Sequence, residues 1–185
     1  EELSGGYTFA GATEAVENRG CVHAYVRSGA EFACVEVSGK DPCVAVLVDL
    51  ESFGCGAQSL LIAGVHLPVG DCAGRRQQIL QRILALDCVG PERVLLLGDM
   101  NVKDDAEVKR LCARLDVAEA RYNGFSWGVR ENKFYEDMAY HGSGMRKDRM
   151  LFGHKVWAEA HLVGQGKQFF DGVEFCLSDH FGLMI

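Results

Sequence analysis

The fold of this chain is decided by Val94-Leu95-Leu96-Leu97-Gly98-Asp99-Met100-Asn101, an apolar run that stops at a glycine and polar residues. Consecutive apolar residues of this kind are typical of a strand buried on both faces, and the glycine indicates where the strand ends. Because side chains two positions apart in an extended chain point to the same side, Asp99 and Asn101 are expected to face one ligand together. The alternative is an Asx turn, in which these residues only close the strand.

Short apolar runs and amphipathic stretches surround this segment. Strands are predicted over 21–26, 33–37, 44–50, 60–66, 93–97, 150–152, 156–162 and 182–185. Helices are predicted over 74–86 and from 104–105 onward, whereas residues 121–147 are expected to be irregular. This order predicts one α/β or α+β domain over residues 1–185, built from packed layers of sheet and helix.

Each predicted helix has one apolar face. In the first, Ile79, Ile83 and Leu86 share that face. The polar surface of the same helix is expected to consist of Arg75, Arg76, Gln77, Gln78 and Arg82. In the second helix the buried stripe is expected to consist of Val108, Leu111, Cys112 and Leu115.

Composition and charge exclude several classes of protein. The chain has 185 residues, a formal net charge of -7, 48% hydrophobic residues and only 3 prolines, which excludes a disordered chain, a collagen-like repeat and a coiled coil. An acidic total argues against a protein that coats long duplex nucleic acid by charge alone, but not against an enzyme that grips one phosphate through a metal ion. No membrane-spanning helix is expected, because no run of about eighteen apolar residues occurs. No secretion signal is expected, because no basic segment followed by an apolar segment opens the chain.

The 8 cysteines are scattered along the sequence and form no Cys-x-x-Cys pair. Several lie inside apolar runs, where a reduced cysteine acts as a small hydrophobic residue. This pattern favours a reduced, intracellular protein of the nucleus or cytoplasm that has no zinc site. A disulfide framework, which the even number of cysteines permits, is the alternative.

Polar residues capable of chemistry lie at the ends of four apolar strands. His66 ends one strand, Gly98-Asp99-Met100-Asn101 ends another, Arg146-Lys147-Asp148-Arg149 precedes a third, and Ser178-Asp179-His180 precedes the last. Layered folds build their sites at such strand ends. A neutral imidazole needs a carboxylate on its second nitrogen, and Asp148 is the natural candidate for orienting His180. The simpler interpretations are a structural histidine at position 66 and a solvated run of charges at 146–149.

In this order the motifs resemble the endonuclease/exonuclease/phosphatase superfamily. The matching stretches are Val65-His66-Leu67, Arg75-Arg76-Gln77-Gln78, Gly98-Asp99-Met100-Asn101, Asp148-Arg149 and Ser178-Asp179-His180. Within the superfamily the chain is most similar to the tyrosyl-DNA phosphodiesterases that cut 5′-phosphotyrosyl links. That similarity rests on residues 98–104 followed by Glu107-Val108, on Phe125-Ser126-Trp127, on Arg146-x-Asp148-Arg149-x-x-Phe152, and on Ser178-Asp179-His180-Phe181-Gly182-Leu183.

The resemblance implies a four-layer α/β sandwich, in which two packed and largely antiparallel sheets are flanked by helices. It also implies hydrolysis of phosphodiesters with Mg²⁺ or Mn²⁺. The implied catalytic residues are Asp99 to activate water, Asn101 to hold the phosphate or nucleophile, His180 to stabilise phosphoryl charge, Asp148 to orient His180, and His66 to line the phosphate pocket. Asp179 would lie near the metal, and Trp127 and Arg149 would bind substrate.

The chain departs from the family pattern at its start. Family members open with a strand that carries an Asn and a strand that ends in Gln-Glu, whose Glu is the main metal ligand; neither stretch is present here. We therefore expect the chain to lack the first strands of the domain, to bind Mg²⁺ weakly and to hydrolyse phosphodiesters poorly.

The implied partner is a phosphodiester substrate, with nucleic-acid ends favoured, no membrane association and a monomeric state. The alternatives are a deadenylase, an abasic-site endonuclease or a phospholipid phosphatase of the same superfamily, and a non-catalytic relative that only binds.

Overall fold

The computed structural model describes residues 2–3, 6–13, 21–54, 56, 58–127, 145–163, 168–170, 173–175 and 182–184. Predicted site residues Asp179 and His180 lie outside these ranges. All statements below concern the described part of the chain.

A six-stranded sheet forms the centre of the molecule, with the strand order β4-β5-β6-β7-β9-β8. Its strands are β4 (Phe32–Val35), β5 (Cys43–Asp49), β6 (Ser59–His66), β7 (Val94–Asp99), β8 (Val117–Glu119) and β9 (Asp148–Gly153). The β6–β7 pair is parallel and the other neighbours are antiparallel. A parallel pair needs a crossover connection, and here the chain between β6 and β7 forms the helix α1 (Ala73–Leu84).

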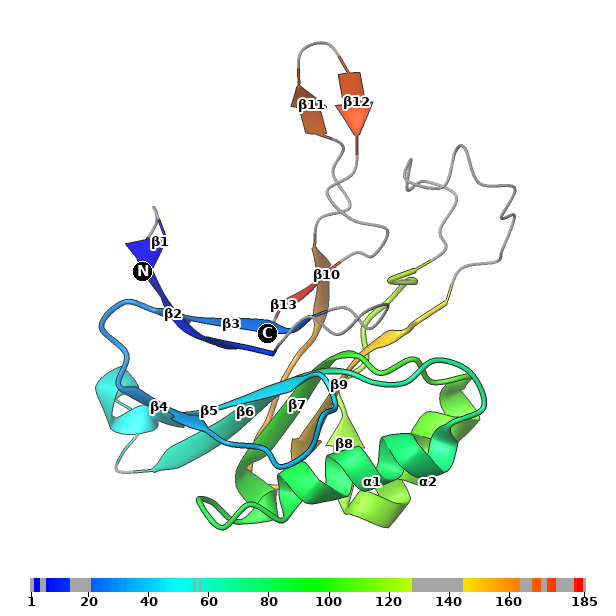
Figure 1. Ribbon diagram of the computed structural model, residues 1–185, viewed down its shortest axis with the longest axis horizontal. Helices are drawn as coiled ribbons and strands as arrows, with labels where there is room; N and C mark the ends of the chain where they lie inside the picture. The colour runs from blue at the N-terminus through cyan, green and yellow to red at the C-terminus, as the bar shows by residue number, and fades with distance from the viewer. Residues whose placement is uncertain are drawn as a thin grey trace.

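Two helices, α1 and α2 (Asp105–Leu115), cover one face of this sheet (Figure 1). The main core lies between the helices and the sheet, and it is built from the apolar stripes that the sequence predicts. Its most buried members include Leu61, Ala63, Ile79, Leu80, Ile83, Leu96, Val108 and Leu151. The helix α2 begins where the side chain of Asp104 accepts a hydrogen bond from the backbone N–H of Glu107, which satisfies one of the free donors of its first turn.

A second layer of strands lies on the opposite face of the sheet (Figure 1). It contains the three-stranded sheet of β1 (Glu2–Leu3), β2 (Tyr7–Ala12) and β3 (His23–Arg27), and the antiparallel pair of β10 (His161–Val163) and β13 (Gly182–Met184). The apolar cluster between β2–β3 and the central sheet consists of Ala10, Val44, Val46 and Val48 with Val22, Ala24, Val26, Phe32 and Ile62. A hairpin of β11 (Gln168–Phe170) and β12 (Val173–Phe175), and the short 3₁₀ helices Leu50–Phe53 and Pro91–Arg93, complete the described elements.

The expected α/β sandwich of two packed, mostly antiparallel sheets with helices is confirmed. The strand predicted over 156–162 is wrong in extent, because only His161–Val163 pairs with another strand. Residues 156–160 instead run without a strand partner and bury Ala158 and Ala160 against Met150. The short strands β8, β11 and β12 were not expected, since three residues carry too little periodicity to be recognised.

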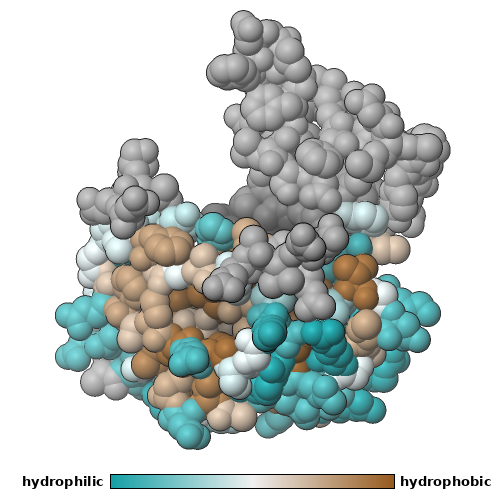
Figure 2. All heavy atoms as spheres, viewed as in Figure 1, coloured by the Kyte–Doolittle hydropathy of each residue, from teal (hydrophilic) through white to brown (hydrophobic). Residues whose placement is uncertain are grey.

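The surface follows the same division between strands and helices. Figure 2 shows hydrophobic residues gathered over the strands at the left and hydrophilic residues over the helices at the right. Among the described residues, no helix is both long and apolar enough to span a membrane.

Candidate active site

Three polar side chains lie side by side at one edge of the central sheet, where the strands β6, β7 and β9 end or begin. They are His66, Asp99 and Asp148. In the parallel β6–β7 pair His66 is opposite Asp99, and in the antiparallel β7–β9 pair Asp99 is opposite Asp148. Residues that face each other across a ladder have Cβ atoms roughly 5 Å apart. The backbone register therefore brings together three residues that are 33 and 49 positions apart in the sequence.

The side chains of Asp99 and Asp148 point away from the helices. Along β7 the alternation places Leu96 in the core beneath α1 and α2, and it places Leu95 and Leu97 in the cluster on the other face, which also contains Met150 of β9. Asp99 and Asp148 are two positions from Leu97 and Met150, so they share this second face. The candidate site thus opens on the side of the second layer of strands.

Asn101 fixes the carboxylate of Asp99. The backbone N–H of Asn101 donates to Oδ1 of Asp99 at 2.9 Å, and its side-chain Nδ2 donates to Oδ2 of Asp99 at 2.9 Å and to the carbonyl of Leu67 at 3.0 Å. The first of these bonds is the Asx turn that the sequence offered as an alternative. Asn101 has a φ of 46°, so it has left the extended conformation in which the two side chains would point to the same side. Both amide hydrogens are engaged, and in this geometry Asn101 orients Asp99.

Gly98 is required at the end of β7. Its φ is 130°, a backbone conformation that side chains rarely adopt, and a Cβ at this position would collide with the carbonyl oxygen of Val65 on β6. The close approach of the two strands brings His66 near Asp99, and Nε2 of His66 lies 3.5 Å from Oδ2 of Asp99. The backbone N–H of Leu67 also donates to the carbonyl of Asp99 at 2.8 Å, which ties the two strand ends together.

The opposed carboxylates of Asp99 and Asp148 are unfavourable for the fold itself. Like charges directly opposite each other on neighbouring strands destabilise a sheet. Local arrangements of this kind are typical of functional sites, where the rest of the structure compensates for them. Carboxylate oxygens are also the ligands that Mg²⁺ and Mn²⁺ prefer.

Two side chains hold the backbone of Asp148 in place. The N–H of Asp148 donates to Oγ of Ser126 at 3.1 Å, and the hydroxyl of Tyr122 donates to the carbonyl of Asp148 at 2.7 Å. Ser126 is fully buried, and burial raises the pKa of Tyr122 above its ordinary value, so its phenol remains a donor at neutral pH. Neither residue was predicted as part of the site, because both come from a segment with no periodic signal.

Trp127 lies next to this region. Its backbone forms an isolated antiparallel bridge with Met145, and the ammonium group of Lys147 lies 3.8 Å from the centre of the indole ring. The backbone N–H of Met100 donates a hydrogen bond to the backbone carbonyl of Lys147 at 3.0 Å. A cation over an indole face is a favourable pairing, and it places a positive charge directly before Asp148.

Arg149 does not lie where the substrate-binding prediction needs it. It is opposite Gly98, so its side chain points to the helix face, and it is 3% exposed. Its guanidinium donates to the carbonyl of Arg146, to Glu119 at 2.6 Å and to Asp105 at 2.9 Å. The alternation along β9, which directs Asp148 into the site, directs its neighbour into an ion-pair network beneath α2.

Arg76 was expected at the surface but is 1% exposed. Its guanidinium donates twice to Oε1 of Glu107, at 2.8 and 2.6 Å, and to the carbonyls of Pro68 and Gly70 at 2.8 and 2.9 Å. Oε2 of Glu107 accepts the backbone N–H of Lys103 at 2.8 Å. This buried pair therefore holds the loop after His66 and the loop after Asn101 against each other. Its signal was present in the sequence, since Arg76 lies three and four positions before Ile79 and Leu80 on the apolar stripe.

The described ranges contain no group of three or more His, Cys, Asp and Glu side chains placed to hold a metal ion. Asp99 nevertheless offers two oxygens whose remaining lone pairs are suited to a hard cation. Asp179, the predicted metal ligand, and His180 lie outside the described residues, so their places remain predictions.

No protein-family model and no curated protein matches the sequence. Solved structures do match the fold. TDP2 of D. rerio, solved in complex with a single-strand DNA product, aligns with 96% of this chain and 74% of its own, at 16% identity and a TM-score of 0.58. Truncated TDP2 of Caenorhabditis elegans aligns with 96% of this chain and 73% of its own, at 18% identity and a TM-score of 0.57. The chain therefore has the fold of these TDP2 structures.

Proposed function

We propose that this protein is a metal-dependent phosphodiesterase that acts on nucleic-acid ends, in the manner of the 5′-tyrosyl-DNA phosphodiesterases. The observation that carries the proposal is the register of three strands, which aligns His66, Asp99 and Asp148 at one sheet edge. The fold shared with TDP2 supports the same reaction class, and the short Ser-Asp-His motif near the end of the sequence completes the expected set of residues.

Asp99 is the group best placed to accept a proton from the attacking water. Its carboxylate is held from both oxygens by Asn101, so it presents a fixed direction to the substrate. A general base can act only if it is directed at the proton that it accepts. A carboxylate that is already held in place does not have to change its orientation during the reaction. His66, whose Nε2 lies 3.5 Å from Oδ2 of Asp99, would donate to a phosphate oxygen.

Asp148 would orient the imidazole of His180, which in turn would stabilise charge on a phosphoryl oxygen. The support for Asp148 is its backbone, which Ser126 and Tyr122 hold from both sides. Asp179 would lie near a bound Mg²⁺ or Mn²⁺, which would supply positive charge to the phosphoryl group. Trp127 would supply a stacking surface for a base or an aromatic leaving group.

We also propose an intracellular protein, in the nucleus or cytoplasm. Its support is the state of the cysteines: among the described residues Cys21, Cys34, Cys43, Cys72, Cys88 and Cys112 are free thiols. Free thiols persist in reducing compartments.

The proposal is tested with four substrates in parallel: 5′-tyrosyl single-stranded DNA, abasic duplex DNA, poly(A) and a phosphoinositide. Protein is in excess over substrate, so that slow turnover is still measured, and each reaction is run with Mg²⁺, with Mn²⁺ and with a chelator. We expect metal-dependent cleavage of the tyrosyl DNA that exceeds cleavage of the other three.

The matched control compares two aspartates at strand ends. Asp99→Asn removes the proposed base. Asp49→Asn makes the same change at the last residue of β5, which lies opposite the first residue of β6 and therefore far from the end of β6 that carries His66. We expect the first variant to lose at least about a hundredfold in rate and the second to keep its rate. Equal rates for both variants, or no metal-dependent cleavage of any substrate, would contradict the proposal.

A further inference from the structure

A groove begins at His66 and follows the helix α1. Its first part is a cavity of about 180 Å³ lined by Asp41, Pro42, His66, Leu67, Pro68, Val69 and Arg75. Its second part is an open hollow of about 790 Å³ lined by Asp41, Arg75, Gln78, Ile79, Gln81, Arg82 and Ala85. The two parts share the Asp41–Arg75 ion pair as a common wall, so they are adjacent, and together they are called the α1 groove below.

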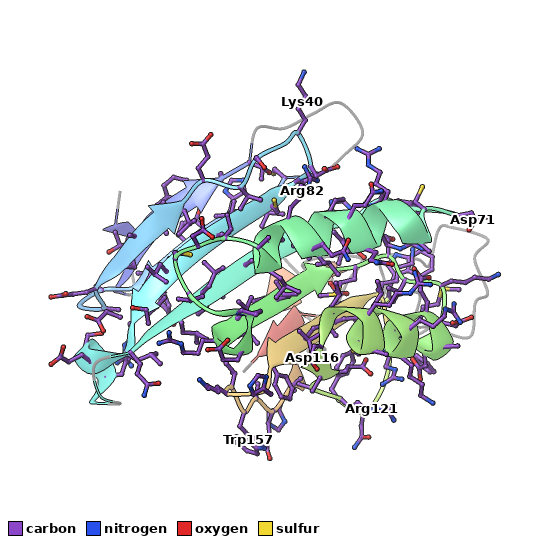
Figure 3. All side chains as sticks on the ribbon, turned by 90° about the horizontal axis from the view of Figure 1, so that it is seen from below. Lys40, Asp71, Arg82, Asp116, Arg121 and Trp157 are labelled. Atoms are coloured by element: carbon purple, nitrogen blue, oxygen red, sulfur yellow. The ribbon has the colours of Figure 1, made fainter. Side chains whose placement is uncertain are left out.

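The α1 groove carries an excess of positive charge in a protein whose net charge is -7. Among its lining residues Arg75 and Arg82 are cationic, and Asp41 is the single carboxylate. Lys40, on the loop that also carries Asp41, is exposed and extends outward from that loop, so it lies outside the groove lining (Figure 3). A groove of this charge next to a candidate phosphodiester site is suited to a polyanion.

Asp41 holds the two arginines in place. Arg75 donates to its Oδ1 at 2.8 Å and Arg82 donates to its Oδ2, while a second nitrogen of Arg82 donates to the carbonyl of Ser38 at 2.9 Å. Burial alone would raise the pKa of Asp41, but the hydrogen bonds and charges of Arg82 and Arg75 outweigh it and lower that pKa, so the carboxylate stays ionised. The side chains of Arg75 and Arg82 remain 49% and 38% exposed. Each guanidinium has five N–H donors, so both can also contact a ligand in the groove.

The first cavity is suited to a ring rather than to another phosphate. Its walls are mostly apolar, from Pro42, Leu67, Pro68 and Val69. An apolar cavity of roughly 150 Å³ is known to hold benzene, so about 180 Å³ accommodates one base or sugar ring. Beyond it, the path along α1 from Arg75 to Ala85 is about 15 Å long at the rise of an α-helix.

We infer that the α1 groove binds the single strand of nucleic acid whose end lies at His66, with one ring in the first cavity and the following phosphates at Arg75 and Arg82. This inference rests on the proposed function, since the strand that enters the groove is the one whose phosphodiester is cut. It adds a binding site that the catalytic residues do not include.

The inference is tested by fluorescence anisotropy with labelled single-stranded DNA and RNA of one sequence, in the presence of a chelator so that binding is measured without cleavage. The test variant is Arg82→Gln, and the control is Arg121→Gln. Arg121 is 60% exposed and lies on the other side of α2, away from Lys40 and Arg82 (Figure 3), so the control makes the same change in net charge outside the groove.

We expect Arg82→Gln to weaken strand binding about fivefold at low salt and to reduce the slope of log affinity against log salt by roughly 0.7, the value for one phosphate contact to a single strand. Arg121→Gln should change neither quantity. Arg75→Gln, at the other half-exposed arginine of the groove, provides a second test variant and should act in the same direction as Arg82→Gln.

Three results would overturn the inference: no binding of the strands, equal effects of the groove variants and the control, or equally tight binding of inorganic polyphosphate, which has no ring for the first cavity. Loss of the proposed function is distinguishable from these. If the strands bind as expected and no substrate is cleaved with metal, the groove stands and the catalytic proposal fails.

Discussion

Removing the charge of Glu107 should destabilise the protein and loosen both loops of the candidate site. In Glu107→Gln the amide carbonyl can still accept from Arg76, but the guanidinium then stays buried without a counter-charge. The amide nitrogen would also face the backbone N–H of Lys103, so that one hydrogen bond is lost. Breaking a buried ion pair by changing one partner costs about 3–5 kcal/mol. For a chain of this length that lowers Tm by roughly 6–20 °C.

The assay is thermal and urea unfolding followed by circular dichroism, together with hydrogen exchange at the amide of Lys103. We expect a lower Tm, a lower free energy of unfolding and faster exchange at Lys103. Lys155→Met, which removes the exposed pair with Glu92, is the control and should leave Tm unchanged. A Glu107→Gln protein with the Tm and the exchange rate of the natural chain would refute the reasoning.

The described contacts lead to three further expectations, for Gly98, Asp105 and Cys112. Gly98→Ala should lower the free energy of unfolding by about 1–3 kcal/mol, because its φ and its approach to Val65 exclude a side chain; urea titration measures this. The hydrogen bond from Arg149 lowers the pKa of Asp105 below 3.8, so its contribution to stability is complete above that value and is lost as the pH falls through the folded pKa. The difference in Tm between the natural chain and Asp105→Asn should therefore shrink below about pH 4, and a constant difference would contradict the pairing. Burial raises the pKa of Cys112 to about 11, so iodoacetamide should label it more slowly than the exposed cysteines near pH 8, as peptide mass spectrometry would show.

Much of the fold was predictable because it depends on local periodicity. The apolar run before Gly98 predicted a buried strand, and β7 occupies Val94–Asp99. The spacing of Ile79 and Ile83 likewise predicted the buried face of α1. These patterns persist in the fold because each strand and helix buries the face that its sequence makes apolar.

The register between strands was not predictable from sequence spacing. The sequence identified His66, Asp99 and Asp148 separately, and only the pairing of the strands shows that they lie opposite one another. The burial of charged residues was not predictable either, because a charged side chain was expected to lie on the surface. Arg76 is buried, and the free-energy cost of burying its charge is offset by Glu107 and by two backbone carbonyls from other parts of the chain. Such partners depend on tertiary structure and leave no local trace.

The central claim is that the aligned strand ends act as one phosphodiester-cleaving site, and a double-mutant cycle on Asp99 and His66 tests it most directly. The rate of metal-dependent cleavage of 5′-tyrosyl single-stranded DNA is measured for the natural chain, Asp99→Asn, His66→Ala and the double variant. The two side chains lie 3.5 Å apart, so we expect each single change to reduce the rate strongly and the double variant to be little slower than the slower single variant. Independent losses that multiply in the double variant, or a full rate in Asp99→Asn, would contradict a shared site.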